Sequence, residues 1–219
     1  MNKPKICAVI VDKNIEVIRK IEPQVELFEE RIDLIGDGWQ DIAKKLKKPW
    51  IACNRCTEEG GRWSGNEARR IEKLLEAIEL GADIVDIELR TKNLDMIVQT
   101  VKKRTECLLS NHNLEKTPSM VDMKEVVNRQ LKAGADICKI VTTARVFEDN
   151  MNILQLIPEF PEARLVSFAM GTAGATSRIL CPIVGGDFTY ASIERGSESA
   201  EGQITVQELR DVYRIMGLP

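Results

Sequence analysis

The sequence predicts an α/β protein with one domain, residues 1–219, folded as a (β/α)8 barrel. Three observations lead to this fold class. Short β-rich segments alternate with helical segments about eight times, as in a barrel of parallel strands. The chain has 219 residues and contains no linker or repeat, and polar residues interrupt its apolar strands near their ends. An open doubly wound sheet allows the same alternation and is the second reading.

The expected elements follow each other along the chain. The strands are expected at residues 5–11, 25–33, 50–55, 84–88, 107–113, 136–141, 164–170 and 188–192. The helices are expected at residues 14–22, 36–46, 66–80, 94–103, 121–133, 146–157, 174–180 and 206–216. Asn66 is the expected N-cap of the third helix, and Gly81 and Gly134 are placed to end the third and fifth helices.

Composition excludes several classes of protein. The 31 basic and 34 acidic residues give a net charge of −3 without a basic stripe, so we expect no nucleic-acid partner. No apolar run approaches the ~20 residues of a membrane span, and the first residues contain no apolar signal region. The six cysteines lie mainly in apolar strands, which favours a reducing, cytoplasmic location. Cys53 and Cys56 have no second pair at zinc-site spacing, so we expect no metal.

Polar residues gather at the ends of successive expected strands. Glu29 and Arg31 end the second strand, Arg55 and then Glu59 follow the third, and His112 ends the fifth. Because the carboxyl ends of the strands meet at one mouth of a barrel, these side chains are expected to line an active site there. Asp86 and Glu88 on the fourth strand are likewise expected to face the inside of the barrel.

Lys139 lies at the centre of an apolar strand, on the same face as Ile137 and Val141. Desolvating an ammonium group costs several kcal/mol, so a lysine at this buried position requires an explanation. One reading is an ion pair with a carboxylate such as Asp86. The other is a nucleophilic amine whose pKa burial and nearby arginines lower, so that it attacks a carbonyl. The arginines expected near it are Arg31, Arg55 and Arg178.

The only histidine of the chain, His112, ends the strand before the one that carries Lys139. An imidazole is suited to proton transfer near neutral pH, and Glu59 is the candidate group to orient it. Arg178 lies at the start of a short helix after the seventh strand, where it suits carboxylate recognition. Residues 185–187 are an alternative phosphate cradle, and the glycines at 60–61 and 196–202 indicate mobile lids or plain connections.

An ordered set of motifs resembles type I 3-dehydroquinate dehydratase nearly from end to end. The set comprises residues 29–33, Arg55 with 58–61, 86–89, 110–112, Lys139, Met170 with 174–178, and 199–203. The resemblance implies a (β/α)8 hydro-lyase of the shikimate pathway, which serves aromatic amino acid biosynthesis. Its substrate is 3-dehydroquinate and its product 3-dehydroshikimate. It also implies no metal or organic cofactor, and a homodimer.

The resemblance further implies a role for each site residue. Lys139 forms a Schiff base with the C3 ketone of the substrate. His112, oriented by Glu59, removes a proton from C2 and helps to expel the C1 hydroxyl group. Arg178 binds the substrate carboxylate. The remaining substrate-binding residues are Glu29, Arg31 and Arg55, which contact hydroxyl groups or tune the site, and Ser199 and Gln203, which close over it.

Two other functions fit the same residues. A Schiff-base aldolase or transaldolase would use a lysine on the sixth strand and would bind a sugar phosphate. A non-catalytic binding barrel would use the charges at the strand ends only as a polar cluster, and Lys139 would form no imine.

Overall fold

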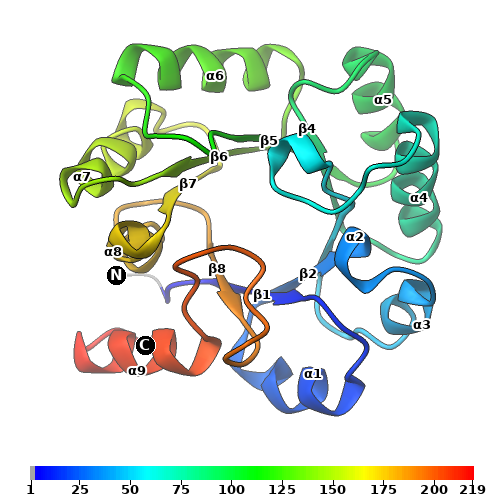
Figure 1. Cartoon of the computed structure of the whole chain (residues 1–219), viewed down its shortest axis with the longest axis horizontal. Helices are drawn as coiled ribbons and strands as arrows, with labels where there is room; N and C mark the ends of the chain where they lie inside the picture. The colour runs from blue at the N-terminus through cyan, green and yellow to red at the C-terminus, as the bar shows by residue number, and fades with distance from the viewer. Residues whose placement is uncertain (1–2) are drawn as a thin grey trace.

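The computed structural model describes residues 3–219 and contains eight parallel strands in one sheet (Figure 1). The strands are β1 Ile6–Ile10, β2 Leu27–Arg31, β3 Trp50–Cys53, β4 Ile84–Glu88, β5 Glu106–His112, β6 Ile137–Thr143, β7 Leu165–Met170 and β8 Thr189–Ser192. Their order in the sheet is β7-β6-β5-β4-β3-β2-β1-β8. Because the last strand pairs with the first, the sheet curls into a nearly closed barrel, which confirms the (β/α)8 fold and excludes the open doubly wound sheet.

The seam of the barrel lies between β7 and β8, which form no ladder within residues 3–219. The backbone N–H of Asp187, just before β8, donates to the carbonyl of Leu165 at 2.9 Å. Further along, the rings of Phe168 and Tyr190 pack edge to face with their centroids 5.9 Å apart. Side-chain packing thus completes the barrel where the ladder is missing.

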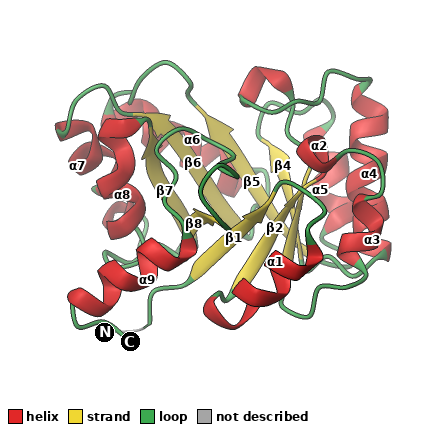
Figure 2. Ribbon diagram, turned by 60° about the horizontal axis from the view of Figure 1, so that its bottom comes forward, coloured by secondary structure: helices red, strands yellow, loops and turns green. Residues whose placement is uncertain are grey.

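Helices surround the sheet on its outer side (Figure 2). They are α1 Ile15–Ile21, α2 Ile32–Ile35, α3 Trp39–Ala43, α4 Glu67–Glu79, α5 Leu94–Val101, α6 Met120–Lys132, α7 Glu148–Leu154, α8 Ala175–Leu180 and α9 Val206–Ile215. Short 3₁₀ turns occupy Glu22–Gln24, Thr57–Glu59, Ile157–Glu159 and Thr172–Gly174. None of the helices described in residues 3–219 is long and apolar enough to cross a membrane.

The residues expected to begin and end helices do so in the structure. The Asn66 side chain accepts a hydrogen bond from the backbone of Ala68 at 2.7 Å, which caps α4. Gly81 and Gly134 follow α4 and α6 with φ of +95° and +93°, a region that other residues rarely adopt.

The structure differs from the expected boundaries around the second strand. β2 ends at Arg31, and the chain turns at once into the four-residue helix α2 instead of continuing to residue 33. The turn brings the Asp33 carboxylate back onto the Arg31 guanidinium at 2.7 and 2.8 Å. The expected helix at 36–46 shrinks to α3. Tertiary contacts rather than periodicity set these boundaries.

The core has two apolar layers on opposite faces of the sheet. The layer inside the barrel includes Cys7, Leu108, Ile137 and Val141, so the predicted inward parity of the sixth strand is confirmed. The layer between sheet and helices is larger and holds most of the remaining buried apolar side chains. Because β-strand residues alternate between these layers, inward positions near the strand ends are free to carry chemistry.

Candidate active site

One cavity of about 500 Å³ opens at the carboxyl ends of the strands. It is lined by all nine side chains that the sequence predicts for the site: Glu29, Arg31, Arg55, Glu59, His112, Lys139, Arg178, Ser199 and Gln203. The geometry therefore brings the predicted set together, while the role of each residue remains a prediction.

Lys139 projects into this cavity from β6 and is 4% exposed. Its Nζ lies 3.1 Å from Oδ2 of Asp86 and 3.3 Å from Oε2 of Glu29. Burial disfavours the ammonium, but these two carboxylates outweigh burial and hold the pKa of Lys139 above its ordinary value. Of the two readings from the sequence, the free protein shows the ion pair with Asp86, and the lowered pKa was wrong because strand parity did not reveal how closely two anions approach the amine.

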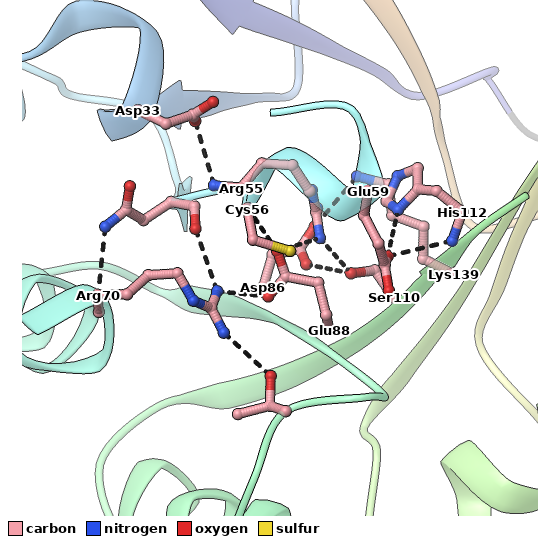
Figure 3. Close-up of polar contacts among 12 residues, drawn as sticks. Asp33, Arg55, Cys56, Glu59, Arg70, Asp86, Glu88, Ser110, His112 and Lys139 are labelled. Atoms are coloured by element: carbon pink, nitrogen blue, oxygen red, sulfur yellow. Dashed lines mark hydrogen bonds and ion pairs between the residues drawn. The ribbon is translucent and has the colours of Figure 1, made fainter. Parts of the chain in front are cut away.

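Asp86 at the centre of β4 connects Lys139 to Arg55 (Figure 3). Ser110 on β5 donates to Asp86 Oδ1 at 2.6 Å and accepts from Arg55 Nη1 at 2.6 Å. Burial opposes ionisation of Asp86, yet Arg55, Lys139 and the Ser110 hydroxyl hold its pKa well below the usual range. Asp86 is therefore an anion throughout the physiological pH range.

The chain of charges extends outward from Arg55. Its Nη1 lies 3.2 Å from Oε1 of Glu88, whose other oxygen pairs with Arg70 from α4 (Figure 3). Arg70 is 1% exposed and also binds Glu67 at 2.8 Å. Positive and negative groups alternate from Glu67 to Lys139, so each buried charge has a partner of opposite sign.

His112 at the end of β5 pairs with Glu59, which lies in the 3₁₀ turn after β3. The Nδ1 atom is 2.8 Å from Glu59 Oε2, and the backbone N–H of His112 donates to the same oxygen at 3.1 Å. Burial, together with the cations of Arg55 and Lys139, holds the pKa of His112 well below its ordinary value. Burial also raises the pKa of Glu59 to about 7. A neutral imidazole that donates from Nδ1 leaves Nε2 free to take a proton.

The loop that carries Glu59 is a packed turn, in contrast to the mobile loop expected at 60–61. Gly61 donates to the carbonyl of Cys56 at 2.9 Å. A Cβ at Gly61 would lie 2.0 Å from the carbonyl oxygen of Arg55, so only glycine fits. The Asp33 carboxylate accepts from the backbone of Arg55 at 3.2 Å. This turn fixes Glu59 in place.

Arg178 in α8 is 2% exposed and lies with its guanidinium carbon 4.5 Å from the centre of the Phe168 ring. Its Nε and Nη2 have no hydrogen-bond partner within the described part of the chain. Burial without a carboxylate lowers the pKa of Arg178 to about 10. An unsatisfied cation in a cavity is arranged to receive an anion.

The loop between β8 and α9 covers one side of the barrel opening (Figure 1). In it, the backbone N–H and the hydroxyl of Ser199 bind Gln203 Oε1 at 2.8 and 3.2 Å. The backbone N–H of Gly171, after β7, donates to the Glu201 carbonyl at 3.1 Å. Both predicted loop residues thus face the cavity from a segment held against the end of β7.

The phosphate cradle considered at 185–187 is wrong. Asp187 pairs with Lys5 and Arg164 at 3.0 and 2.8 Å, and its backbone bonds the start of β7. These groups lie at the amino ends of the strands, opposite the cavity, because the segment precedes its strand instead of following it.

One trio of possible metal ligands lies within residues 3–219: Glu29, Cys53 and Asp86, with donor atoms within 4.8 Å of one another. Lys139 pairs with both carboxylates of this trio. Its ammonium supplies the positive charge that a cation would otherwise bring.

Several residues of the site were not assigned a role from the sequence. Asp33 and Ser110 belong to the recognised motifs, whereas Arg70 has the appearance of an ordinary helix arginine. Tyr190 lines the cavity from β8. An aromatic residue within a strand is typical of a core, so no sequence signal distinguished it.

A buried lysine and a histidine–carboxylate pair that line one cavity at the mouth of a (β/α)8 barrel are the groups that enzymes acting through a lysine imine use. The sequence profile described as Type I 3-dehydroquinase matches residues 6–218. The chain belongs to this family of hydro-lyases. The recognition and the class of enzyme predicted from the sequence are confirmed.

Individual relatives agree with this assignment. The 3-dehydroquinate dehydratase of Dehalococcoides mccartyi is 42% identical over 215 residues, which cover 98% of this chain and 96% of that protein. The protein of the same name from Methanocaldococcus jannaschii is 36% identical over 221 residues, covering 97% and 99%. The crystal structure of the Geobacillus kaustophilus 3-dehydroquinate dehydratase superimposes with a TM-score of 0.85 at 26% identity, covering 99% and 92%.

Proposed function

We propose that this protein dehydrates 3-dehydroquinate to 3-dehydroshikimate through an imine on Lys139. The supporting observation is that Lys139, a buried lysine, lies between two carboxylates in the same cavity as the His112–Glu59 pair. The function expected from the motif set agrees with the family of the chain.

The imine forms without a net change of charge. The ammonium of Lys139 first gives a proton to the carboxylate of Glu29, 3.3 Å away, while Asp86 stays ionised. The amine then attacks the ketone carbon, the carbonyl oxygen leaves as water, and the nitrogen remains as a protonated imine. Ammonium plus ketone therefore gives iminium plus water.

The iminium makes elimination easy because it withdraws electrons from the adjacent carbon. His112 takes the C2 proton at Nε2, while Glu59 holds Nδ1–H and stabilises the imidazolium. The imidazolium then gives its proton to the C1 hydroxyl, which departs as water. Hydrolysis of the imine returns the amine and releases the product.

The other predicted residues bind the substrate. Arg178, with two nitrogens unpartnered in the described chain, takes the carboxylate. Arg31, Arg55 and Glu29 meet the hydroxyl groups, and Ser199 and Gln203 close the site.

Borohydride reduction tests this proposal. In the presence of 3-dehydroquinate, the peptide that contains Lys139 should gain the mass of the reduced adduct, and Lys139→Met should gain none. Unmodified Lys139 in protein that turns over substrate would contradict the proposal. Adduct formation with a sugar phosphate, but not with 3-dehydroquinate, would favour an aldolase.

We also propose that the protein acts in the cytoplasm as a homodimer. All six cysteines are free, which suits a reducing compartment. Exposed apolar side chains on and before α7, Val146, Phe147 and Met151, offer a surface for a second copy. Sedimentation analysis of the wild type and of Phe147→Glu tests the dimer, since a monomeric wild type would exclude it.

A further inference from the structure

Tyr190 on β8 is held rigidly in the wall of the active-site cavity. It is 3% exposed and lines the cavity together with Lys139 and Arg178. Its ring packs edge to face on Phe168 and on Phe188, with centroid distances of 5.9 and 5.4 Å. These contacts fix the direction of the phenol hydroxyl.

The face of the Tyr190 ring lies against the reacting amine. Lys139 Nζ is 4.1 Å from the ring centroid, within the range of a cation–π contact. The amine and the ring that carries the hydroxyl thus line the same cavity face to face. A substrate carbonyl oxygen, two bonds from Nζ once the amine has attacked, would enter the same cavity.

The Tyr190 hydroxyl is buried and has no hydrogen-bond partner among residues 3–219. Buried tyrosine hydroxyls nearly always find a partner, because leaving one unpaired is unfavourable. The other tyrosine, Tyr213, follows this rule, since its hydroxyl donates to the carbonyl of Ile179 at 3.0 Å. Of the two tyrosines, Tyr190 in the cavity wall is the one without a partner among the residues that the structure describes.

We propose that the Tyr190 hydroxyl donates a hydrogen bond to the substrate oxygen on the carbon that Lys139 attacks. This role rests on the proposed imine chemistry. As the N–C bond forms, the π electrons of the carbonyl move to that oxygen, and the donor stabilises the developing negative charge. The oxygen then takes protons that leave the amine nitrogen and departs as water. Tyr190 keeps its own proton throughout, consistent with burial and the nearby Glu29 carboxylate raising its pKa well above the ordinary value.

Tyr190→Phe tests the proposal because it removes one oxygen and keeps the ring on the amine. The rate of imine formation, measured by borohydride quenching in a single turnover, should fall about tenfold or more. The melting temperature of the free protein should not fall, because the deleted hydroxyl is unpaired.

Tyr213→Phe is the matched control. It breaks an existing hydrogen bond in the layer between the sheet and the helices, on the opposite face of the sheet from Lys139, so it should lower the melting temperature and leave the rate of imine formation unchanged. An unchanged rate in Tyr190→Phe, with normal trapping on Lys139 in the wild type, would overturn the role of Tyr190 alone. Failure to trap Lys139 in the wild type would overturn the imine chemistry and this proposal with it.

Discussion

Glu30 is a buried carboxyl group whose pKa shift can be measured through the pH dependence of the free energy of unfolding. Its side chain is 0% exposed, and neither carboxylate oxygen has a hydrogen-bond partner within residues 3–219. It lies opposite Ile10 and Ala52 in the sheet, on the face that packs against the helices. Burial raises the pKa of Glu30 to about 8, so this carboxyl is mostly protonated at neutral pH.

The stability of the fold should therefore fall as the pH rises. In the unfolded chain Glu30 ionises near its ordinary pKa of 4.5, whereas in the folded protein it holds its proton up to a pH of about 8. Between these values the folded state binds more protons. Linkage then lowers the free energy of unfolding by up to about 1.4 kcal/mol per pH unit, or about 4–5 kcal/mol over the window. The folded protein keeps the full stability below a pH of about 4.5, the unfolded pKa of Glu30. The whole loss is reached above a pH of about 8, the folded pKa.

Glu30→Gln removes this titration while keeping the shape of the side chain. The variant should match the wild type near a pH of about 4.5 and exceed it by several kcal/mol near about 8, which raises the melting temperature by roughly 2–4 °C per kcal/mol. Urea unfolding across the window measures both proteins. The exposed Glu72→Gln serves as control and should change stability by less than about 0.5 kcal/mol. A difference between Glu30→Gln and wild type that stays constant with pH would refute the reasoning.

Three further substitutions test the site. Glu59→Gln should lower kcat about 10²–10⁴-fold, since the amide stabilises the imidazolium of His112 poorly. It should also remove the loss of wild-type activity below a pH of about 7, where the Glu59 carboxylate takes a proton. Arg178→Gln should raise KM about 10–100-fold through a lost charged hydrogen bond, and should raise the melting temperature of the free protein by removing a buried unpaired cation. Arg70→Gln should cost about 3–5 kcal/mol of stability, because it leaves the buried Glu88 short of a partner.

Steady-state kinetics and thermal unfolding check these expectations against their own controls. Glu67→Gln removes the half-exposed partner of Arg70 and should cost less than about 1 kcal/mol. An equal loss of stability in Arg70→Gln and Glu67→Gln would show that the buried Arg70–Glu88 ion pair contributes no more than the half-exposed Arg70–Glu67 pair. An acid limb that persists in Glu59→Gln would assign that titration to another group, and a lower melting temperature for Arg178→Gln would mean that its guanidinium stabilises the free protein.

The sequence predicted the barrel because strand and helix patterns depend on local periodicity. Each of the eight strands and the caps at Asn66, Gly81 and Gly134 could be inferred in this way. The short helix α2 could not, because the turn after Arg31 is set by the ion pair with Asp33, and the helix expected at 36–46 is shortened to α3. Such a contact involves two residues whose approach no periodic pattern encodes.

The members of the site were also predictable, whereas their pairing was not. Parallel strands bring their carboxyl ends to one mouth, so polar residues of inward parity must converge there. Distances across the barrel do not follow from parity, and Glu29 meets Lys139 from 110 positions away in the sequence. For this reason the sequence could not decide between an ion-paired Lys139 and one with a lowered pKa, and it assigned no role to Tyr190.

The raised pKa of Lys139 is compatible with imine formation because the nitrogen carries the same positive charge before and after the reaction. The free enzyme holds an ammonium between Asp86 and Glu29, and the protonated imine has the same charge at nearly the same place. Carboxylates that stabilise the first therefore stabilise the second, whereas they give the neutral amine no such advantage. The amine exists only during the internal proton transfer, so its scarcity slows the attack without making the imine less stable. Because the positive charge is stabilised both before and after the attack, the remaining requirement is to stabilise the transition state at the carbonyl oxygen. This is the role proposed for the hydroxyl of Tyr190.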